Sequence, residues 1–384
     1  MFKNILQKLE NPKRPLLGPN VKALQFWGLL LPKNVFMKYF YLLMHLLVSI
    51  FTLTEQIDVW FVKSDMNLLL NNLKITMLAT ISVIKVTTFL SWQKYWVSII
   101  EYVTKADLNQ RNTTDKKKLE LLDAFTKYCR KITYLYWSLM YTTVIIVMVQ
   151  PLFKYISSET YRENVKNGTD TYLQVVSSWV PWDKNTMIGY LAASVYQSYA
   201  AIYGGGWITS FDTNSMVIMV FFRAELELLR IDSKDIFGSE SREVDHGVAM
   251  ERLKDCHRRH VELVKNKKTF KECINERILL QIETNPMQRF LTTEYLVFGV
   301  AQLFIYCWHS NDVLFAVSNL MRGPYESIWW SKSNKYRKDL YILAAQFNEI
   351  VVFSAGPFTK LTVATFISVS TFLSYSKISL HVKY

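Results

Sequence analysis

The stretch KLTVATFISVSTFLSYSKISL, residues 360–380, combines the hydrophobicity of a membrane segment with many hydroxyl groups. Eight Ser or Thr residues lie between Thr362 and Ser379. A helix turns about 100° per residue, which places five of these hydroxyls within roughly one third of its circumference. These hydroxyls either bond to helix carbonyls and neighbouring helices or border a water-filled pathway, and the stretch alone leaves both interpretations open. The five are Thr362, Thr365, Ser368, Ser376 and Ser379.

The composition of the whole chain favours a membrane protein. Half of the 384 residues are hydrophobic, 15% are aromatic, and the mean hydropathy is +0.07. Soluble domains of this length are usually more polar. The early apolar stretch FWGLLLP, residues 26–32, is too short for the core of a secretory signal peptide, so none is expected.

Uncharged runs indicate where the chain crosses the bilayer. Residues 132–153 and 185–211 form runs of 22 and 27 residues, and about 20 helical residues cross the hydrocarbon core. Weaker runs carry lysines that can extend toward the headgroups, as Lys74 and Lys85 do in residues 66–90. We therefore expect an all-α, polytopic transmembrane bundle of seven helices in a single domain. The expected helices are 35–56, 66–92, 130–153, 185–212 extending to about 235, 268–284, 290–310, and a seventh with a cytosolic part at 339–354 and a membrane part at 361–380.

The distribution of Lys and Arg predicts the orientation. Basic residues gather in four segments, with seven in 1–38, nine in 93–131, eleven in 223–268 and five in 322–338. The segments between them are poorer, with one in 55–66 and four in 151–184. Because basic loops stay on the cytosolic side, the N-terminus is expected in the cytosol and the C-terminus outside. This orientation is opposite to that of a G-protein-coupled receptor.

The net charge of +13 does not by itself indicate a nucleic-acid partner. In a chain with many apolar spans, clusters such as DKKKLE (115–120) are typical of cytosolic loops, and we expect no nucleic acid to bind. CHRRH, residues 256–260, is the nearest approach to a metal site, but it has no second ligand pair and its arginines repel a cation. The four cysteines show no disulfide pattern. Neither a metal nor a cofactor is expected.

Common catalytic motifs are absent from the sequence. Walker A, GxSxG and HExxH do not occur, so phosphoryl transfer, nucleophilic hydrolysis and zinc proteolysis have no local support. The three glycines of YGGGW, residues 203–207, lie in a long uncharged run and are more typical of a kink or a close helix approach than of a phosphate loop. An enzyme is therefore not expected.

Several motifs follow one another between residues 300 and 380. They are Tyr306-Cys307-Trp308, Asn311, the spacing from Tyr325 to Trp329, Arg337-Lys338-Asp339-Leu340, Ala355-Gly356 with Phe358, and Ser374-Tyr375-Ser376. In this order and spacing they resemble the C-terminal third of an insect odorant receptor. Upstream, the likeness lies in hydropathy, length and inverted orientation.

The resemblance implies a subunit of an odorant-gated cation channel. In that family a tuning subunit forms a hetero-tetramer with a shared coreceptor around a central pore, in the plasma membrane of olfactory sensory neurons. Residues 223–270 are too few to hold the coreceptor's long insertion, so the tuning subunit is implied. The seventh helix would line the pore. The implied pore-lining residues are Thr365, Ser368, Phe372, Ser376, Ile378, Ser379 and Leu380.

By the same resemblance, an odorant pocket lies in the outer half of the membrane between helices two, three, four and six. Such a pocket suits a small, volatile, mostly apolar ligand held by shape and one or two hydrogen bonds, with membrane lipid around the bundle. Placed by depth, the implied ligand-binding residues are Thr76, Thr80, Met140, Tyr141, Val144, Tyr190, Ser194, Gln197, Tyr295 and Phe298.

Other classes of membrane protein share this hydropathy. A gustatory-type receptor would carry the signature TYxxxxxQF, which is absent, and a G-protein-coupled receptor needs an outer N-terminus. No inverted repeat typical of transporters is evident. Current through the membrane without added G protein separates a channel from a receptor that acts through G proteins.

The fifth helix of the family is difficult to place. Residues 274–308 number 35, too few for two crossings of about 20 residues each and a turn, and Pro286 interrupts the pattern. The basic segment 322–338 nevertheless requires a fifth crossing. We therefore expect that about one helix is missing, and that the chain is a truncated variant that gates poorly. A longer form, with an apolar insertion between about residues 281 and 285, is the expected competent receptor.

The orientation makes a prediction about access and glycosylation. A tag at residue 1 should bind antibody only after the membrane is permeabilised. Of the two sequons, Asn167 lies in the expected outer loop and Asn112 in an inner one, so only Asn167 should carry a glycan. Gel mobility of Asn167→Gln and Asn112→Gln variants before and after glycosidase treatment measures this. A glycan on Asn112 would contradict the orientation.

Overall fold

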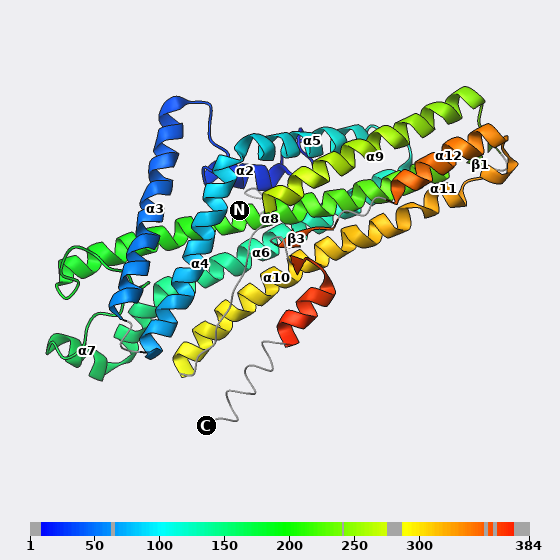
Figure 1. The fold of residues 1–384 in the computed structure, drawn as a ribbon. Coiled ribbons are helices and arrows are strands. Elements are labelled where there is room, and N and C mark those ends of the chain that lie inside the picture. Colours follow the sequence, from blue (N-terminus) through cyan, green and yellow to red (C-terminus); the bar gives the residue numbers. More distant parts are fainter. Residues whose placement is uncertain are drawn as a thin grey trace.

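Long α-helices account for most of the computed structural model, which describes residues 9–62, 66–239, 242–274, 286–348, 352–355 and 359–371 (Figure 1). The helices are α2 (Gly18–Phe26), α3 (Val35–Phe61), α4 (Met66–Ser91), α5 (Gln93–Arg111), α6 (Lys116–Ser157), α7 (Glu159–Lys166), α8 (Met187–Lys234), α9 (His246–Ile274), α10 (Pro286–Leu320), α11 (Arg322–Glu326) and α12 (Asn334–Phe347). Two short antiparallel pairs join them, β1 (Gly238–Ser239) with β2 (Arg242–Glu243) and β3 (Ser354–Ala355) with β4 (Thr359–Lys360). A 3₁₀ turn covers Trp329–Ser331, and residues 363–371 are helical.

Capping side chains set the starts of the longest helices. Asn34 accepts a hydrogen bond from the backbone amide of the second residue of α3, and Asp115 does the same for α6, both at 2.9 Å. Thr186 accepts from the amide of Gly189 at the start of α8. These side chains satisfy amides that the first turn of a helix leaves without partners. The α4 and α5 axes meet at Trp92 with a bend of 77°.

Helix α8 is the central helix of the bundle. Figure 1 shows α6, α8 and α10 running side by side, with α3 and α4 crossing them at one end and α5 and α9 covering the other half. The side chains of residues 205–222 of α8 are buried on every face of the helix. A helix enclosed in this way needs no lipid-facing stripe. Six of the seven α8 residues from Thr209 to Ser215 are polar, and Phe211 is the exception.

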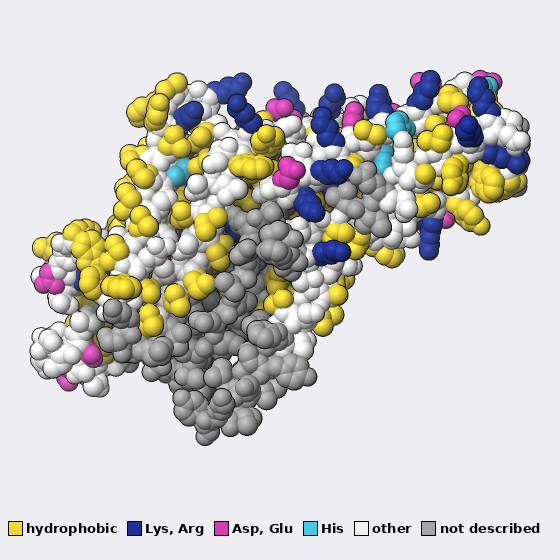
Figure 2. Space-filling view, in the orientation of Figure 1, with side chains coloured by type: hydrophobic (Ala, Val, Ile, Leu, Met, Phe, Trp, Pro, Cys, Tyr) yellow, Lys and Arg dark blue, Asp and Glu magenta, His cyan; other side chains and the backbone are white. Residues whose placement is uncertain are grey.

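The outer surface of α3 is apolar. Large hydrophobic side chains are exposed along one stripe of the helix, with the three- to four-residue spacing of a helix face. In Figure 2 hydrophobic side chains lie over α3, whereas Lys and Arg gather over α5 and α9. Among the described helices, α3 and α6 are long and apolar enough to cross a membrane, and the bent α4–α5 pair is a third candidate. The stripe comprises Phe36, Phe40, Leu43, Leu46, Ile50, Leu53, Ile57 and Trp60.

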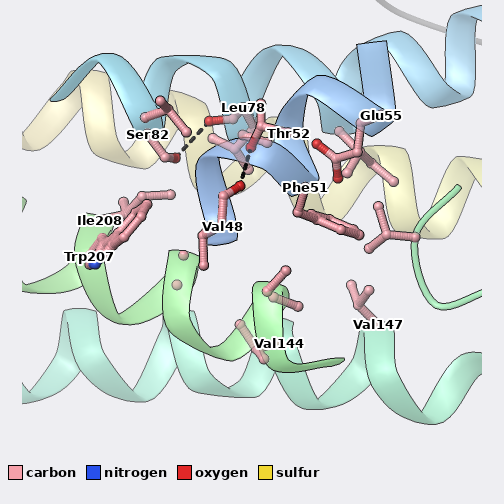
Figure 3. A pocket seen from close by; sticks show the side chains of 18 of the residues that line it. Val48, Phe51, Thr52, Glu55, Leu78, Ser82, Val144, Val147, Trp207 and Ile208 are labelled. Carbon is pink, nitrogen blue, oxygen red and sulfur yellow. Dashed lines mark hydrogen bonds between the residues drawn. The ribbon is translucent and has the colours of Figure 1, made fainter. Parts of the chain in front are cut away.

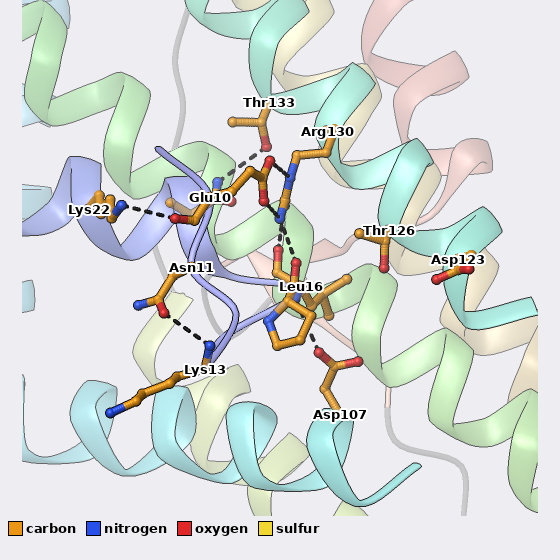
Figure 4. A network of polar contacts seen from close by, with 12 residues as sticks. Glu10, Asn11, Lys13, Leu16, Lys22, Asp107, Asp123, Thr126, Arg130 and Thr133 are labelled. Carbon is orange, nitrogen blue, oxygen red and sulfur yellow. Dashed lines mark hydrogen bonds and ion pairs between the residues drawn. The ribbon is translucent and has the colours of Figure 1, made fainter. Parts of the chain in front are cut away.

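Residues 9–34 fold into the bundle, which the sequence did not predict. Arg130 of α6 donates to both carboxylate oxygens of Glu10 at 2.6 Å and to the carbonyls of Pro15 and Leu16 (Figure 4). Asp107 of α5 accepts from the Leu16 amide at 3.1 Å. These contacts tie the segment to two helices. Trp27, Leu29 and Leu30 of FWGLLLP pack in the core of the bundle, whereas Phe26 is exposed.

The glycines of YGGGW allow close approach, as their position in the sequence indicates. A Cβ added at Gly206 would lie 2.2 Å from the indole ring of Trp27, and one at Gly205 would lie 3.0 Å from Val144. A Cβ at Gly204 would meet no atom within 4 Å. The N-terminal segment therefore packs closely on α8 at Gly206, and α6 packs closely on it at Gly205. Gly204 faces open space.

Several helix ends differ from the expected spans. Helix α6 continues well beyond its apolar run, because charged residues extend a helix as readily as apolar ones once it leaves the bilayer, whereas α8 ends at Lys234, close to the expected end at about 235. Helix α9 begins 22 residues before the expected start at 268, and α12 ends at Phe347 instead of 354. Residues 275–285, where the shortened fifth helix was inferred, lie outside the described residues.

The glycine contacts predict unequal effects of two matched substitutions. Gly206→Ala should destabilise the protein by about 1–3 kcal/mol, because the new methyl group displaces Trp27 from the bundle. Gly204→Ala should leave stability unchanged or raise it by up to about 1 kcal/mol through helix propensity. Thermal unfolding of both variants in lipid nanodiscs measures the difference. Equal melting temperatures would show that Trp27 does not pack on α8.

Candidate functional site

An apolar cavity of about 100 Å³ lies between α3, α4, α6 and α8. In Figure 3, side chains of α3 and α4 face those of α6 and α8 across it. An engineered protein cavity of about 150 Å³ holds benzene, so this space suits a molecule with few heavy atoms, and small side-chain movements would enlarge it. The residues labelled there are Val48, Phe51, Thr52, Glu55, Leu78, Ser82, Val144, Val147, Trp207 and Ile208.

Small residues create this space. Helix α8 turns four residues without bulky side chains toward it, and α4 contributes Ala79. Phe51 and Trp207 stand at its sides. Aliphatic and aromatic walls around a small volume recognise a ligand mainly by shape. The four small residues of α8 are Ala200, Ala201, Gly204 and Gly205.

The hydroxyl groups in the wall are already satisfied. Thr52, Ser82 and Thr143 each donate to the carbonyl oxygen one helical turn earlier, at 3.2, 2.7 and 3.0 Å. Such bonds remove the need for a polar partner inside the cavity. The hydroxyls therefore add little polarity to the wall.

Glu55 is different, because its carboxyl group is buried in this wall. The side chain is 2% exposed, and its Oε2 atom has no hydrogen-bond partner among the described residues. Sequence analysis did not select Glu55, since an acid near the end of a hydrophobic run ordinarily reaches water. Only the fold shows that it faces inward with Phe51 and Thr52 (Figure 3).

Two of the implied ligand-binding residues, Met140 and Val144, line the cavity. Gln197 is buried but holds the loop before α8: its Oε1 accepts from the amides of Val175 and Val176 at 3.1 and 3.4 Å. This bond places Val176 at the cavity edge. Tyr190 donates to the carbonyl of Leu173 in the same loop.

Four other implied ligand-binding residues that the structure describes lie outside the cavity wall. Thr76 is buried on α4, and Thr80 accepts a hydrogen bond from Gln56. Tyr141 and Ser194 are half-buried on α6 and α8. The side chains of Tyr295 and Phe298 lie outside the described residues.

Next to the cavity, Asp212 of α8 is the centre of a fully buried polar cluster. Lys85 of α4 and Tyr306 of α10 donate to its Oδ1 at 3.2 and 2.9 Å. Tyr136 of α6 and Gln302 of α10 donate to its Oδ2 at 2.6 and 2.5 Å. One carboxylate thus links three other helices to α8.

The cluster corrects the interpretation of Lys85 as a lysine that extends toward the headgroups. Its side chain is 9% exposed and pairs with Asp212, which is 127 residues away in sequence. A buried lysine requires a compensating charge, and this carboxylate supplies it. Asp212 directly follows the uncharged run that ends at Phe211, so the search for uncharged runs did not draw attention to it.

A larger, polar cavity of about 950 Å³ lies between α5, α8 and α9. Several of its charged side chains pair with one another: Arg259 binds Glu225 at 2.8 Å and also binds Asp232. Burial would lower the pKa of Arg259, but these two carboxylates raise it. Charged side chains of both signs make up most of the lining of this cavity.

The CHRRH motif does not gather metal ligands in the described residues. Cys256 is buried, and burial raises the pKa of its thiol to about 12, which keeps it protonated and a poor ligand. The His257 ring pairs with Gln346, and the His260 ring packs on Phe347 at 4.9 Å.

The described part of the seventh helix shows how its hydroxyls are used. Ser368 is exposed and donates to the carbonyl of Ala364 at 3.0 Å, while Thr365 is half-buried and donates to the carbonyl of Lys360 at 2.7 Å. Phe366 packs on Phe304 of α10 with ring centroids 5.1 Å apart. The aromatic face therefore holds the helix to the bundle. Phe372, Ser376, Ile378, Ser379 and Leu380 lie outside the described residues.

Comparisons with known proteins agree with this architecture. The fold is similar to two structures of the insect olfactory receptor OR5 from Machilis hrabei, one of them in complex with eugenol, with TM-scores of 0.75 and 0.71. Both comparisons cover 94% of this chain and 97% of that chain at 15% sequence identity. They show the fold, a helical membrane bundle, and confirm the fold class expected from the sequence. No match was found among proteins with curated functions.

The sequence itself defines the family. A family model described as 7tm Odorant receptor matches residues 65–285 and 280–373. The chain therefore belongs to the odorant receptor family, which confirms the resemblance seen in its C-terminal third. Proteins of this family are membrane receptors and not enzymes, as the absence of catalytic motifs indicated.

The Asp212 cluster predicts strong coupling between its charged members. Asp212→Asn alone should cost about 3–5 kcal/mol, because Lys85 remains buried without a countercharge. The double variant Lys85→Met with Asp212→Asn should lose less than the sum of the two single substitutions Lys85→Met and Asp212→Asn. Thermal unfolding in nanodiscs completes the cycle. Additive losses would show that the pair is not a unit.

Proposed function

We propose that this odorant receptor binds a small, volatile, mainly apolar ligand in the cavity between α3, α4, α6 and α8. The observation that carries the proposal is the cavity itself, which is small, apolar and bordered by Phe51 and Trp207. The OR5 structure in complex with eugenol supports a ligand of this class for a receptor with the same fold. The polar cavity beside α9 suits such a molecule poorly, because its walls carry paired charges.

We also propose that the chain acts as the tuning subunit of a cation channel with a coreceptor, in the plasma membrane of olfactory sensory neurons. The family match and the exposed hydroxyl of Ser368 support this assembly. Phe366 fixes one face of the helix to α10, which leaves the hydroxyl face free to border a pore shared with other subunits.

The helix inferred to be missing after α9 would affect gating of the channel. It does not contribute to the wall of the ligand cavity. The cavity is built from four helices that precede residue 235. Ligand binding is therefore a property of the chain as it stands. Odorant-evoked currents through a channel with the coreceptor should be small for this chain and larger for the longer form.

Filling the cavity should abolish ligand binding. Gly204→Phe directs a ring into the open space beside Gly204, whereas Val195→Phe adds the same ring to an exposed position of α8 outside the cavity. We expect Gly204→Phe to lose binding of a small aromatic odorant by at least tenfold, and Val195→Phe to keep it. Calorimetric titration of both variants in nanodiscs measures the affinities. Unchanged affinity in Gly204→Phe would place the ligand elsewhere.

The pore proposal predicts selective labelling of the seventh helix. Cysteines at Thr365 and Ser368 should react with a water-borne thiol reagent in an assembled channel and alter its current. A cysteine at Phe366 should react slowly, because this position packs on Phe304. Faster reaction at position 366 than at 368 would contradict the proposed orientation of the helix.

A further inference from the structure

Glu55 is an unusual group to find in an apolar cavity. It lies one helical turn after Phe51 and three residues after Thr52, so all three side chains share one face of α3. The carboxyl group is buried, and no Lys, Arg or His pairs with it among the described residues. Burying a carboxyl group without a partner is costly, so Glu55 lowers the stability of the empty receptor.

The neighbouring acid uses the polar groups that are available there. Asp58 Oδ2 accepts from Ser177 at 2.5 Å and from Asn72 at 3.2 Å, and Lys184 lies 3.9 Å from Oδ1. Lys184 therefore balances the charge of Asp58. The Glu55 carboxyl group has no such cationic partner in the cavity wall, since the wall hydroxyls donate to their own helices.

A ligand with a positively charged donor would satisfy this group. We propose that Glu55 makes the receptor selective for small hydrocarbon ligands that carry one amino group, with the ammonium bound to the Glu55 carboxylate. This inference rests on the proposed function, because it names the ligand class of the same cavity. A neutral amine that enters the cavity takes up a proton and forms a charge-assisted bond with the carboxylate, whereas esters and ketones form at most a neutral hydrogen bond and hydrocarbons form none. An ammonium gains a charge-assisted bond, and an alcohol gains a weaker neutral one.

The test uses three probes of matched shape on the full chain in lipid nanodiscs. Benzylamine, benzyl alcohol and toluene share one ring and differ in the donor. Calorimetric titration should rank benzylamine first, benzyl alcohol second and toluene third, with at least about tenfold between first and third. Glu55→Gln should reduce the ratio of benzylamine to toluene affinity to about one. Glu101→Gln, a matched change at an exposed position of α5, should keep the wild-type ratio.

The outcomes separate this inference from the proposed function. If the wild-type chain binds none of the three probes, the cavity is not the ligand site and the proposed function fails. If toluene binds but benzylamine binds no tighter, or if Glu55→Gln keeps the ratio, only the role of Glu55 fails. Glu55→Met provides a second variant, because removing a buried carboxyl group without a partner should raise the melting temperature of the empty receptor. A melting temperature lowered by Glu55→Met would show that Glu55 has a structural partner, and would overturn the inference.

Discussion

The Asp212 carboxylate is the interaction on which the arrangement of the helices depends. It accepts hydrogen bonds from Lys85, Tyr136, Gln302 and Tyr306, and so connects α4, α6 and α10 to the central α8. Helices in a bilayer gain little from hydrophobic burial against one another, so polar contacts and close packing decide their positions. A buried charge also restricts how the helices can pack, because any other arrangement that separates it from its partners is strongly destabilised. Three of the four helices around the ligand cavity meet at this carboxylate.

Close packing at glycines also fixes the position of α8 relative to its neighbours. Gly206 admits Trp27 of the N-terminal segment, and Gly205 brings α8 against Val144 of α6. One residue earlier, Gly204 has no neighbour, and the bundle opens into the cavity. Three adjacent glycines thus have three different environments. The same turn of α8 therefore packs against the N-terminal segment and α6 on two sides and leaves space for a ligand on a third.

The sequence predicted the class of fold because the hydropathy of each segment can be read from that segment alone, without knowledge of its neighbours in space. The run at 132–153 lies inside α6, and the motifs after residue 300 indicated the family that the comparisons confirmed. Contacts between distant residues were not accessible in this way. Lys85 was interpreted as a lysine that extends toward the headgroups, because nothing in its own segment of sequence indicates the contact with Asp212.

The candidate site shows the same limit. Placement by membrane depth selected Met140 and Val144, which line the cavity, but also Gln197 and Tyr190, which hold a loop. The depth of a residue in the membrane does not determine whether its side chain points into the bundle. The rotation of the helix decides this, and it depends on how the neighbouring helices pack. Glu55 was missed for this reason, since an acid late in an apolar run has the same sequence pattern whether it faces water or a cavity.

The central claim is that the ligand occupies the apolar cavity between α3, α4, α6 and α8. A cryo-electron-microscopy structure of the chain in nanodiscs with a bound small aromatic odorant tests it most directly. The account predicts ligand density in contact with Phe51 and Val144, within reach of the Glu55 carboxyl group. Ligand density in the polar cavity between α5, α8 and α9, with the apolar cavity empty, would contradict it.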